Sequence, residues 1–408
     1  MRADGRATVW RDRSSARGSM SHVNRSRRAT RRPTVAIAGG GVAALEAMYA
    51  LRAAAEEQIE LEVIAPEPHF WYRPLAVVEP FGAPPPPRFE LVALAADAGA
   101  TVTLAAVTSV DVAERVLTLG SGGELEYSAL VVATGTRAVP AIEGALTFRG
   151  PADVGLFGRA LSDIEAGEGD HLVFASPSRA TWTLPLYELA LLTDRWLHQR
   201  GIRDQLRLTI VTPEERPLLA FGAHVADAVE EALANRGVSV LAGVHAGTFA
   251  DGRLSLVPHA TLDASHVVAL PELVANAPDG LPRGWGGFVP VDEFGRVVGA
   301  PDVYAAGDVT TVAIKQGGIA AQQAATAAAT LAADLGFAPP PPPFRPTLRG
   351  VLLTGELPRY LRTDLATATG IVDTDPLWWP PAKIAGHHLA PHLALHTVTD
   401  EAESTTEP

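Results

Sequence analysis

The chain contains no cysteine among its 408 residues, and this absence excludes several kinds of chemistry. Disulfide bonds, thiolate metal sites and cysteine nucleophiles all need a thiol, so none of them can operate here. The lack of cysteine does not indicate whether the protein resides in an oxidising or a reducing compartment. Any electron transfer by this protein must therefore proceed without a thiol intermediate.

The sequence also lacks an apolar run of the roughly 20 residues that a membrane-spanning helix needs. We therefore expect a soluble or peripheral protein in the cytoplasm, with contact to the inner face of the membrane as the second option. The net charge of −13 is uneven, because residues 1–32 hold ten arginines and only two aspartates. The acidic remainder should repel polyanions, so we predict no nucleic-acid partner.

The two ends of the chain are excluded from the predicted fold. By composition, residues 1–32 form a disordered basic extension; alternatively, the true start of the protein is Met20. Residues 397–408 form an acidic tail that we also expect to be disordered. The length between these ends suits two or three hydrophobic cores and is sufficient for an enzyme.

A glycine-bearing turn follows the first predicted strand, residues 34–38, and precedes residues of helical composition. Its first glycine permits a sharp turn, its third removes a Cβ that would obstruct a pyrophosphate, and its last alanine lets the helix pack close to the strand. The helix N-terminus supplies amide groups and partial positive charge to phosphates. The predicted cofactor contacts of this turn are Gly39, Gly41, Val42, Ala43 and Ala44.

Two later segments fit the same kind of site. The predicted strand Ala129–Val132 runs into Ala133-Thr134-Gly135, whose small side chains allow close passage beneath a dinucleotide. The predicted strand Asp302–Ala306 ends at Gly307-Asp308, at the edge where open α/β sheets bind ligands. The Asp308 carboxylate can accept a hydrogen bond from a ribityl hydroxyl.

An alanine-rich helix is predicted to begin after Lys315. Its N-terminus, at Gly318 and Ile319, is expected to face a flavin pyrimidine, where negative charge develops on reduction. Lys315 would add a full positive charge at that position.

Taken together, the three motifs resemble the FAD-dependent pyridine nucleotide-disulfide oxidoreductase superfamily over about residues 33–337. The segments His69–Leu75 and Lys315–Gly318 are most similar to sulfide:quinone oxidoreductases and type II NADH dehydrogenases. This resemblance implies FAD as the cofactor. It also implies that a proline loop brings Arg73 and Pro74 to the flavin and that the main chain at Val107 contacts the adenine.

The resemblance implies an α/β fold with two Rossmann-like dinucleotide-binding domains, the second inserted in the first, and a small C-terminal cap. The predicted bounds are 33–145 with 290–337 for the FAD-binding domain, 146–289 for the second domain and 338–396 for the cap. In the second domain, an NADH-binding member would carry a glycine-rich loop after its first strand. Ser176–Pro185 stands there without a glycine, and Trp182 would obstruct a pyrophosphate, so NAD(P)H binding is left open.

Two carboxylates have alternative interpretations. Glu67, which follows the predicted strand Leu61–Ile64, either binds a ribose hydroxyl of FAD or is an ordinary exposed residue. Glu188 lies in a Glu-Leu-Ala stretch that resembles one near the flavin in the superfamily. It is a proton relay, a partner of Lys315 or half of an interdomain salt bridge. Lys315 and Glu188 are therefore the candidate catalytic residues.

The C-terminal segment offers an interface or a buried cap. Trp378 and Trp379 either contact a membrane or pack against the flavin domain. His388, His392 and His396 have helical spacing, but Pro391 interrupts their common face, so we predict no metal site.

These observations predict an FAD-dependent oxidoreductase that transfers two electrons from a small-molecule donor, with NAD(P)H left open, to a quinone-like or other small acceptor. The alternative is a non-catalytic FAD-binding sensor or scaffold whose donor site has decayed. An NAD-dependent dehydrogenase without flavin would leave Gly307-Asp308 unexplained. A homodimer is a further expectation for the assembly.

Overall fold

The computed structural model describes residues 32–179, 182–367 and 369–395. The chain divides into two units, residues 1–32 and 33–408, and the second unit carries the fold. The predicted disordered ends, the alternative start at Met20 and the third histidine, His396, lie outside the described residues.

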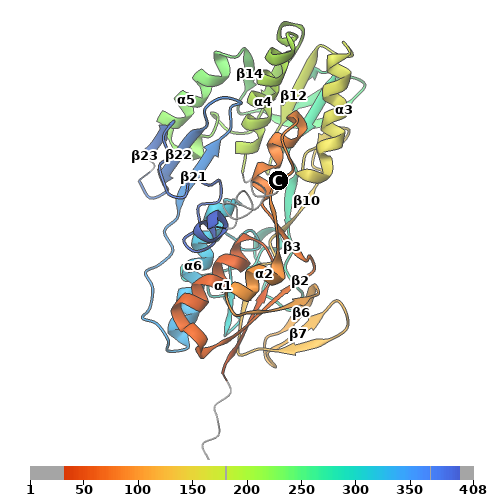
Figure 1. Cartoon of the computed structure of the whole chain (residues 1–408). Helices are drawn as coiled ribbons and strands as arrows, with labels where there is room; N and C mark the ends of the chain where they lie inside the picture. Colours follow the sequence, from red (N-terminus) through yellow and green to blue (C-terminus); the bar gives the residue numbers. More distant parts are fainter. Residues whose placement is uncertain (1–31, 180–181, 368, 396–408) are drawn as a thin grey trace, which may run out of the picture. The chain divides into compact units, whose positions relative to one another are not determined.

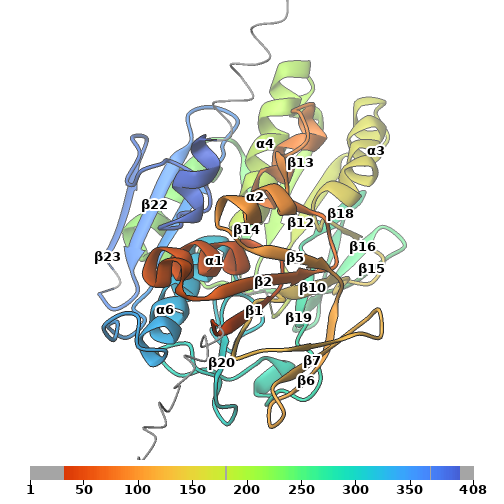
Figure 2. The same cartoon turned by 60° about the horizontal axis from the view of Figure 1, so that its bottom comes forward.

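A five-stranded parallel sheet carries the predicted FAD motifs. Its order is β20–β9–β1–β2–β5, with β1 at its centre (Figure 2). The bounds are β1 Thr34–Ala38, β2 Glu60–Ala65, β5 Thr101–Leu104, β9 Ala129–Val132 and β20 Val303–Ala305. The predicted strands at 34–38, 61–64, 129–132 and 302–306 are therefore confirmed, with end shifts of at most one residue.

Both faces of this sheet are covered, which explains why its central strands are almost wholly apolar. On one face, Val35 and Ile37 of β1 pack against helices α1 (Val42–Ala55), α2 (Leu91–Asp97) and α6 (Gly317–Asp334). On the other, Ala36 and Ala38 contact the antiparallel sheet β6–β7–β8. The bounds of that sheet are β6 Val107–Asp111, β7 Val116–Leu119 and β8 Glu124–Glu126.

Helices α1 and α6 lie side by side, although their sequences are far apart (Figure 1). Their shared core is rich in alanine, and short side chains allow two helices to approach closely. The fully buried alanines at this contact are Ala44, Ala47, Ala324, Ala327 and Ala328. This packing holds the beginnings of both helices next to the ends of β1 and β20.

A second parallel sheet has the order β11–β18–β12–β13–β14. Its bounds are β11 Leu146–Thr147, β12 His171–Ala175, β13 Arg207–Val211, β14 Val238–Leu241 and β18 His266–Ala269. Helices α3 (Val154–Glu165), α4 (Leu184–Arg200) and α5 (Ala223–Ala234) pack into its apolar core. The sheet β15 (His245–Ala250), β16 (Arg253–Val257) and β17 (Ala260–Asp263) contributes to a further core with it.

The chain crosses between the two parallel sheets twice. It leaves the first sheet through β10 (Thr136–Val139) and returns through β19 (Glu272–Ala275), and these two strands pair antiparallel. A small hairpin-like pair, β3 (His69–Trp71) with β4 (Arg88–Glu90), flanks the 3-10 helical segment Arg73–Phe81. The predicted domain bounds remain predictions, although the topology places one sheet's sequence inside the other's.

The C-terminal segment forms an antiparallel sheet of β21 (Thr347–Leu352), β22 (Arg359–Asp364) and β23 (Thr369–Asp373). It contacts α4 and α5 of the second domain, and Figure 1 shows its strands in blue beside α5. Gly350 is required at this contact, because a Cβ there would meet the side chains of Leu184 and Phe221 at 2.8 and 2.9 Å.

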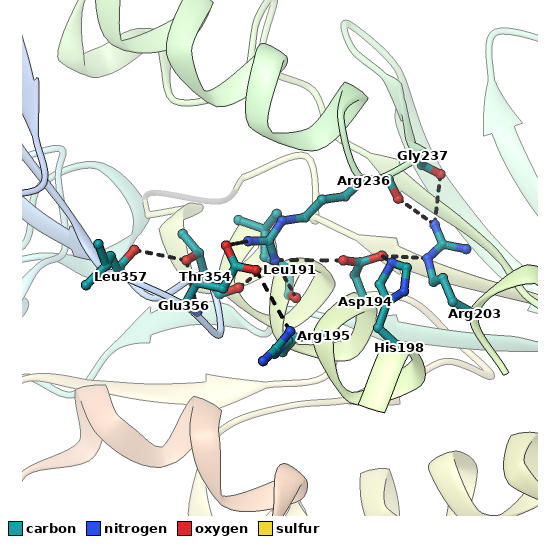
Figure 3. Close-up of polar contacts among 10 residues, drawn as sticks. All are labelled: Leu191, Asp194, Arg195, His198, Arg203, Arg236, Gly237, Thr354, Glu356 and Leu357. Atoms are coloured by element: carbon teal, nitrogen blue, oxygen red, sulfur yellow. Dashed lines mark hydrogen bonds and ion pairs between the residues drawn. The ribbon is translucent and has the colours of Figure 1, made fainter. Parts of the chain in front are cut away.

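Charged groups also tie this sheet to the second domain (Figure 3). Arg236 donates to the carbonyl oxygen of Thr354 at 2.6 Å and forms an ion pair with Glu356 at 3.3 Å. The same guanidinium lies 3.7 Å from the buried carboxylate of Asp194, which Arg203 contacts at 2.5 Å. Arg236 therefore joins the β21–β22 turn to the interior of the second domain.

Candidate functional site

The glycine turn at 39–44 has the geometry that the sequence predicts for a phosphate-binding turn. Gly39 has φ +134°, and a Cβ on it would overlap the carbonyl oxygen of Ala133, so only glycine fits where β1 and β9 end together. A Cβ on Gly41 would meet nothing within 4 Å. Gly41 begins α1 without a side-chain cap, which leaves open space in front of the helix N-terminus.

Gly307 stands where the two helices come closest to β20. It has φ +79°, and a Cβ on it would lie 2.9 Å from the Cβ of Ala43. Its amide donates to Oε1 of Gln323 at 2.8 Å. The glycine therefore lets the chain turn between α1 and α6 and directs the next residue, Asp308, into the cavity described below.

Asp308 and Lys315 form a partly desolvated pair of opposite charges. Burial raises the pKa of Asp308 to about 6, and the charge of Lys315 opposes this rise. Burial lowers the pKa of Lys315 to about 8, and Asp308 opposes this fall. The Asp308 carboxylate has no hydrogen-bond partner in the described part of the chain, so it retains full capacity to accept from a ligand hydroxyl.

Lys315 is held mainly by main-chain oxygens. Its Nζ donates to the carbonyl of Thr310 and, at 2.7 Å, to that of Val312. The ammonium also lies 4.0 Å from the ring centre of Phe288. These contacts fix the charge near the start of α6.

The N-terminus of α6 is capped by its own chain. Gln316 accepts a hydrogen bond from the amide of Ile319 at 2.9 Å, while its Nε2 donates to the carbonyl of Arg349. The Ile319 amide is therefore already paired, although Gly318 and Ile319 lie at the helix start that the sequence predicts. Their contact with a cofactor stays a prediction.

A cavity of about 310 Å³ lies where the two parallel-sheet domains and the C-terminal segment meet. Asp308, Lys315 and Glu188 line it, together with Arg73 and Pro74 from the predicted flavin loop. Apolar side chains form much of the remaining wall, among them Val77, Phe148, Trp182, Leu184, Leu270 and Leu273. Lys315 and Lys383 are the only lysines in the sequence, and both line this cavity.

Glu188 forms a salt bridge with Lys383, so of its alternative interpretations the salt bridge is realised and the pairing with Lys315 is not. Its carboxylate is fully buried and lies 2.7 and 2.8 Å from Nζ of Lys383. It also accepts from the amide of Leu353 at 2.9 Å, and Lys383 donates to the carbonyl of Pro74 at 3.0 Å. Burial raises the pKa of Glu188, and the lysine charge opposes that rise. The ion pair thus connects the second domain, the flavin loop and the C-terminal segment.

A second buried carboxylate holds the C-terminal segment from the opposite side. Glu46 of α1 accepts hydrogen bonds from the amides of His387, His388 and Leu389 at 2.7 to 2.9 Å. These amides begin the helical stretch 389–395, where a carboxylate is favourable. Neither Glu46 nor Lys383 was among the predicted site residues.

The paired tryptophans differ in their surroundings. Trp378 packs edge-on against Tyr360 at 5.4 Å, and its indole donates to the carbonyl of Ala382. Both contacts lie within the C-terminal segment, so packing of Trp378 against the flavin domain stays a prediction. Trp379 is 87% exposed, and its interface role also stays a prediction.

The other predicted FAD contacts lie on different parts of the first domain. Glu67 is exposed in the loop after β2, and Val107 begins β6. The hydroxyl of Thr134 is buried without a hydrogen-bond partner, next to Gly135 at φ +68°. Such an orphaned hydroxyl is consistent with a ligand oxygen or nitrogen above this crossing.

In the second domain, the carboxylate that follows β13 is already hydrogen bonded within the protein. Tyr187 of α4 donates to Oε2 of Glu214 at 2.5 Å, and Thr212 donates to the same oxygen at 3.2 Å. Glu214 follows β13, where a carboxylate would receive ribose hydroxyls in a nucleotide-binding domain. In the preceding loop, Trp182 packs on Phe221 at 5.9 Å. The loop thus carries the bulky side chain of Trp182 where a phosphate loop has glycine. Glu214, the carboxylate expected to accept from ribose hydroxyls, already accepts from Tyr187.

The donor set of the first domain fits FAD. An uncapped helix N-terminus faces open space at Gly41, Thr134 and Asp308 present unpaired oxygens, and glycines permit the close crossings. Within residues 32–179, 182–367 and 369–395, no group of histidines and carboxylates could hold a metal ion. No helix in those same ranges is long and apolar enough to cross a membrane.

Comparisons with known proteins agree with this geometry. The model of the pyridine nucleotide-disulphide oxidoreductase family matches residues 33–171 and 192–329. The unmatched stretch between these segments contains the glycine-free loop. A sulfide-quinone reductase of Aquifex aeolicus is 28% identical over 230 residues, which is 52% of this chain and 50% of that protein.

An NADH dehydrogenase-like protein of Mycobacterium tuberculosis is 28% identical over 229 residues, covering 52% of this chain and 56% of that protein. The chain thus spans about half the length of the curated relatives that it matches. The crystal structure of the sulfide:quinone oxidoreductase of Aquifex aeolicus has a TM-score of 0.76 at 20% identity, covering 84% of this chain and 86% of that one.

The likeness in structure confirms the predicted fold class of two Rossmann-like domains with a C-terminal module. The family match confirms the predicted superfamily. The protein belongs to the pyridine nucleotide-disulphide oxidoreductase family.

Proposed function

We propose that this protein is an FAD-dependent oxidoreductase that transfers two electrons from a small donor to a quinone-like or other small acceptor without a thiol. The observation that carries the proposal is the cavity in which Asp308 and Lys315 meet the flavin loop and the Glu188–Lys383 pair. The Asp308–Lys315 and Glu188–Lys383 pairs are charged groups in the wall of a largely apolar cavity. Charged groups with shifted pKa values in such a cavity are typical of an active site.

The cofactor would be held by residues of both glycine motifs. The α1 N-terminus at Gly41, Val42 and Ala43 would bind the pyrophosphate, and Asp308 would accept from the ribityl chain. Thr134 would pair its orphaned hydroxyl with the cofactor. Arg73 and Pro74 of the flavin loop would contact the flavin from the cavity wall. When bound, FAD supplies the two-electron redox chemistry.

The chain's own residues would manage charge and protons at this cavity. Lys315 holds a cation beside the start of α6, where negative charge arises during flavin reduction. Because its pKa is lowered to about 8, Nζ of Lys315 is able to give up a proton near neutral pH. Glu188 keeps Lys383 positioned at the opposite wall, and the apolar side chains between them exclude water.

Pyridine nucleotides fit the donor side poorly. A dinucleotide would have to compete with Tyr187 for Glu214 and would meet side chains where a phosphate loop needs glycine. We therefore propose a donor that does not bind through an adenosine ribose. Persulfide chemistry through a cysteine is excluded by the sequence itself.

A non-catalytic FAD-binding sensor or scaffold is the second candidate. The same Tyr187–Glu214 hydrogen bond favours it, because a closed second domain would also follow from loss of a donor site. The two candidates differ in whether any donor reduces the bound flavin.

Anaerobic titration of the purified protein with NADH, NADPH, sulfide and a quinol, followed by flavin absorbance, tests the proposal. We expect flavin bleaching by at least one donor other than NADH and NADPH, and reoxidation by a short-chain quinone. Bound flavin that no donor bleaches would favour the scaffold. Absence of flavin absorbance, or full retention of FAD by an Asp308→Ala variant, would contradict the site itself.

A further inference from the structure

Two arginines face each other across the C-terminal sheet. Arg349 of β21 is the register partner of Arg362 of β22, so their side chains extend from the same face of the sheet. Like charges directly opposite each other in an antiparallel pair are destabilising. This arrangement therefore needs an explanation, especially at the edge of the module that closes the cavity.

Neither guanidinium has a protein partner to neutralise it. In the described ranges, no hydrogen bond or ion pair links Arg349 or Arg362 through its side chain, and Nε of Arg349 is buried without any acceptor. Most buried donors in proteins are paired, and an orphaned donor on a charged group is costly. A bound anion would therefore offset the repulsion between the two guanidiniums and would also accept a hydrogen bond from the unpaired Nε of Arg349.

In the described part of the chain, the surroundings of the two arginines supply burial but no ion pair. Burial lowers the pKa of Arg349, and the positive charge of Arg362 lowers it further. The carboxylates on neighbouring positions of this face, Asp364 and Asp373, accept hydrogen bonds from the amides of Ala366 and Asp375 instead. Trp378, packed on Tyr360, covers part of the same face.

We propose that Arg349 and Arg362 form a binding site for a phosphate oxyanion, either free phosphate or the phosphate of a lipid head group. Two guanidiniums supply converging N–H donors to one anion, and arginine is suited to phosphate because its planar donors match the oxygens. An anion between them removes the repulsion and gives Nε of Arg349 an acceptor. Arg362 is exposed, so a ligand can reach this pair from solvent or from a membrane surface.

Titration of the FAD-loaded protein with inorganic phosphate, at constant ionic strength and followed by calorimetry, tests the site. We expect saturable binding to the wild type and affinities at least about tenfold lower for Arg349→Gln and for Arg362→Gln. Phosphate should raise the melting temperature of the wild type and leave that of both variants unchanged. In phosphate-free buffer, Arg362→Gln should melt above the wild type, because the repulsion is gone.

Arg359→Gln is the matched control. Arg359 lies on the same strand but points to the opposite face, so it carries the same charge change away from the site. The control should keep phosphate affinity within about twofold. Equal losses in Arg359→Gln and in the two site variants would overturn the proposal, since they would report only net charge. An unchanged flavin spectrum checks that each variant is folded, and Arg349→Lys, which keeps the charge, replaces Arg349→Gln if that variant fails to fold.

Co-sedimentation with vesicles distinguishes the two sources of phosphate. Vesicles of phosphatidylglycerol are compared with vesicles of phosphatidylcholine, again for the wild type and the three glutamine variants. Loss of phosphatidylglycerol binding in the two site variants alone assigns the site to a head group, and loss of inorganic phosphate binding alone assigns it to the free anion. If the wild type binds neither, the proposal is wrong.

Discussion

Arginine outnumbers lysine 31 to two in this chain, and the two lysines line the same cavity. The guanidinium of arginine stays protonated in proteins, whereas the pKa of a lysine amine shifts readily when it is buried. Lys315 follows this expectation, because burial lowers its pKa to about 8. The chain thus places Lys315, a cation of lowered pKa, in the wall of the cavity where the proposed electron transfer takes place.

Replacing Lys383 by methionine should destabilise the fold by about 3–5 kcal/mol, because the fully buried carboxylate of Glu188 loses its counter-charge. The free energy of unfolding in urea measures this. The double variant Lys383→Met with Glu188→Gln should recover much of the loss, since it removes both charges together. A double variant as unstable as the single one would contradict this account.

Asp308 predicts a pH dependence that can be separated from the rest of the protein. Its pKa is about 6 in the fold, against about 3.9 for an ordinary aspartate, so the folded state binds its proton more tightly. Its contribution to stability is therefore complete below pH 4 and is lost as the pH rises to about 6. The full loss is at most about 3 kcal/mol, a figure in which the opposing charge of Lys315 is already included.

The flavin-free protein, unfolded in urea between pH 4.5 and 7.5, measures this effect against Asp308→Asn. The wild type should lose stability relative to that variant across this window and reach a constant difference above it. A difference that does not change with pH would show that Asp308 is not desolvated.

The partners of single residues were harder to predict than their positions. Glu188 was located by its local stretch, but its partner Lys383 lies 195 residues later. Nothing in the local pattern around either residue encodes that contact, since it depends on how the C-terminal segment returns to the cavity. The rarity of lysine was the one signal in the sequence that pointed to Lys383.

At the scale of elements, two glycines of the turn between β1 and α1 have different roles, although only one residue lies between them. Gly39 is needed for the crossing with Ala133, whereas Gly41 only leaves space in front of α1. The strand, turn and helix were predictable because a short apolar run, the spacing of the glycines and an alanine-rich composition are all local properties of the sequence. The closure of the second domain by Tyr187 and Glu214 was not, because it joins a helix to the end of the following strand.

Alanine substitutions should distinguish the two glycines. Gly39→Ala should lower stability by several kcal/mol with or without FAD, since a Cβ overlaps the chain and the backbone has positive φ. Gly41→Ala should leave the stability of the flavin-free protein within about 0.5 kcal/mol and weaken FAD binding instead. Thermal unfolding and flavin titration of both variants provide the measurement, and equal stability losses would refute the distinction.

At the scale of the molecule, the C-terminal module is attached from several directions. Glu46 binds it to the first domain, Glu188 binds it near the cavity, and Arg236 binds its first turn to the second domain. Its sheet also buries Leu348, Leu352 and Leu361 against the core of the second domain. The sequence indicated a separate module after the second proline run, but not these attachments, which all join distant parts of the chain.

Removing the Arg236 attachment should loosen this module first. Arg236→Met should cost about 1–3 kcal/mol, because the half-buried guanidinium holds the Thr354 carbonyl and faces two carboxylates. Hydrogen exchange should accelerate most in residues 350–357. Arg195→Met is the control, since its exposed ion pair with Glu356 at 3.9 Å should contribute under about 1 kcal/mol. Uniform acceleration over the whole chain would contradict a local attachment.

The position of β20 at the edge of the first sheet has a consequence for synthesis of the protein. A ribosome adds about 5–20 residues per second, so β1, β2, β5 and β9 are made many seconds before β20. The strands of the second sheet are made within that interval, and that sheet is complete once β18 has been added. Until α6 has also been made, α1 lacks the helix against which its alanines pack. The second domain should therefore complete its fold before the first domain, although the first domain begins the chain. A cofactor held by both glycine motifs can be bound only after Asp308 has left the ribosome.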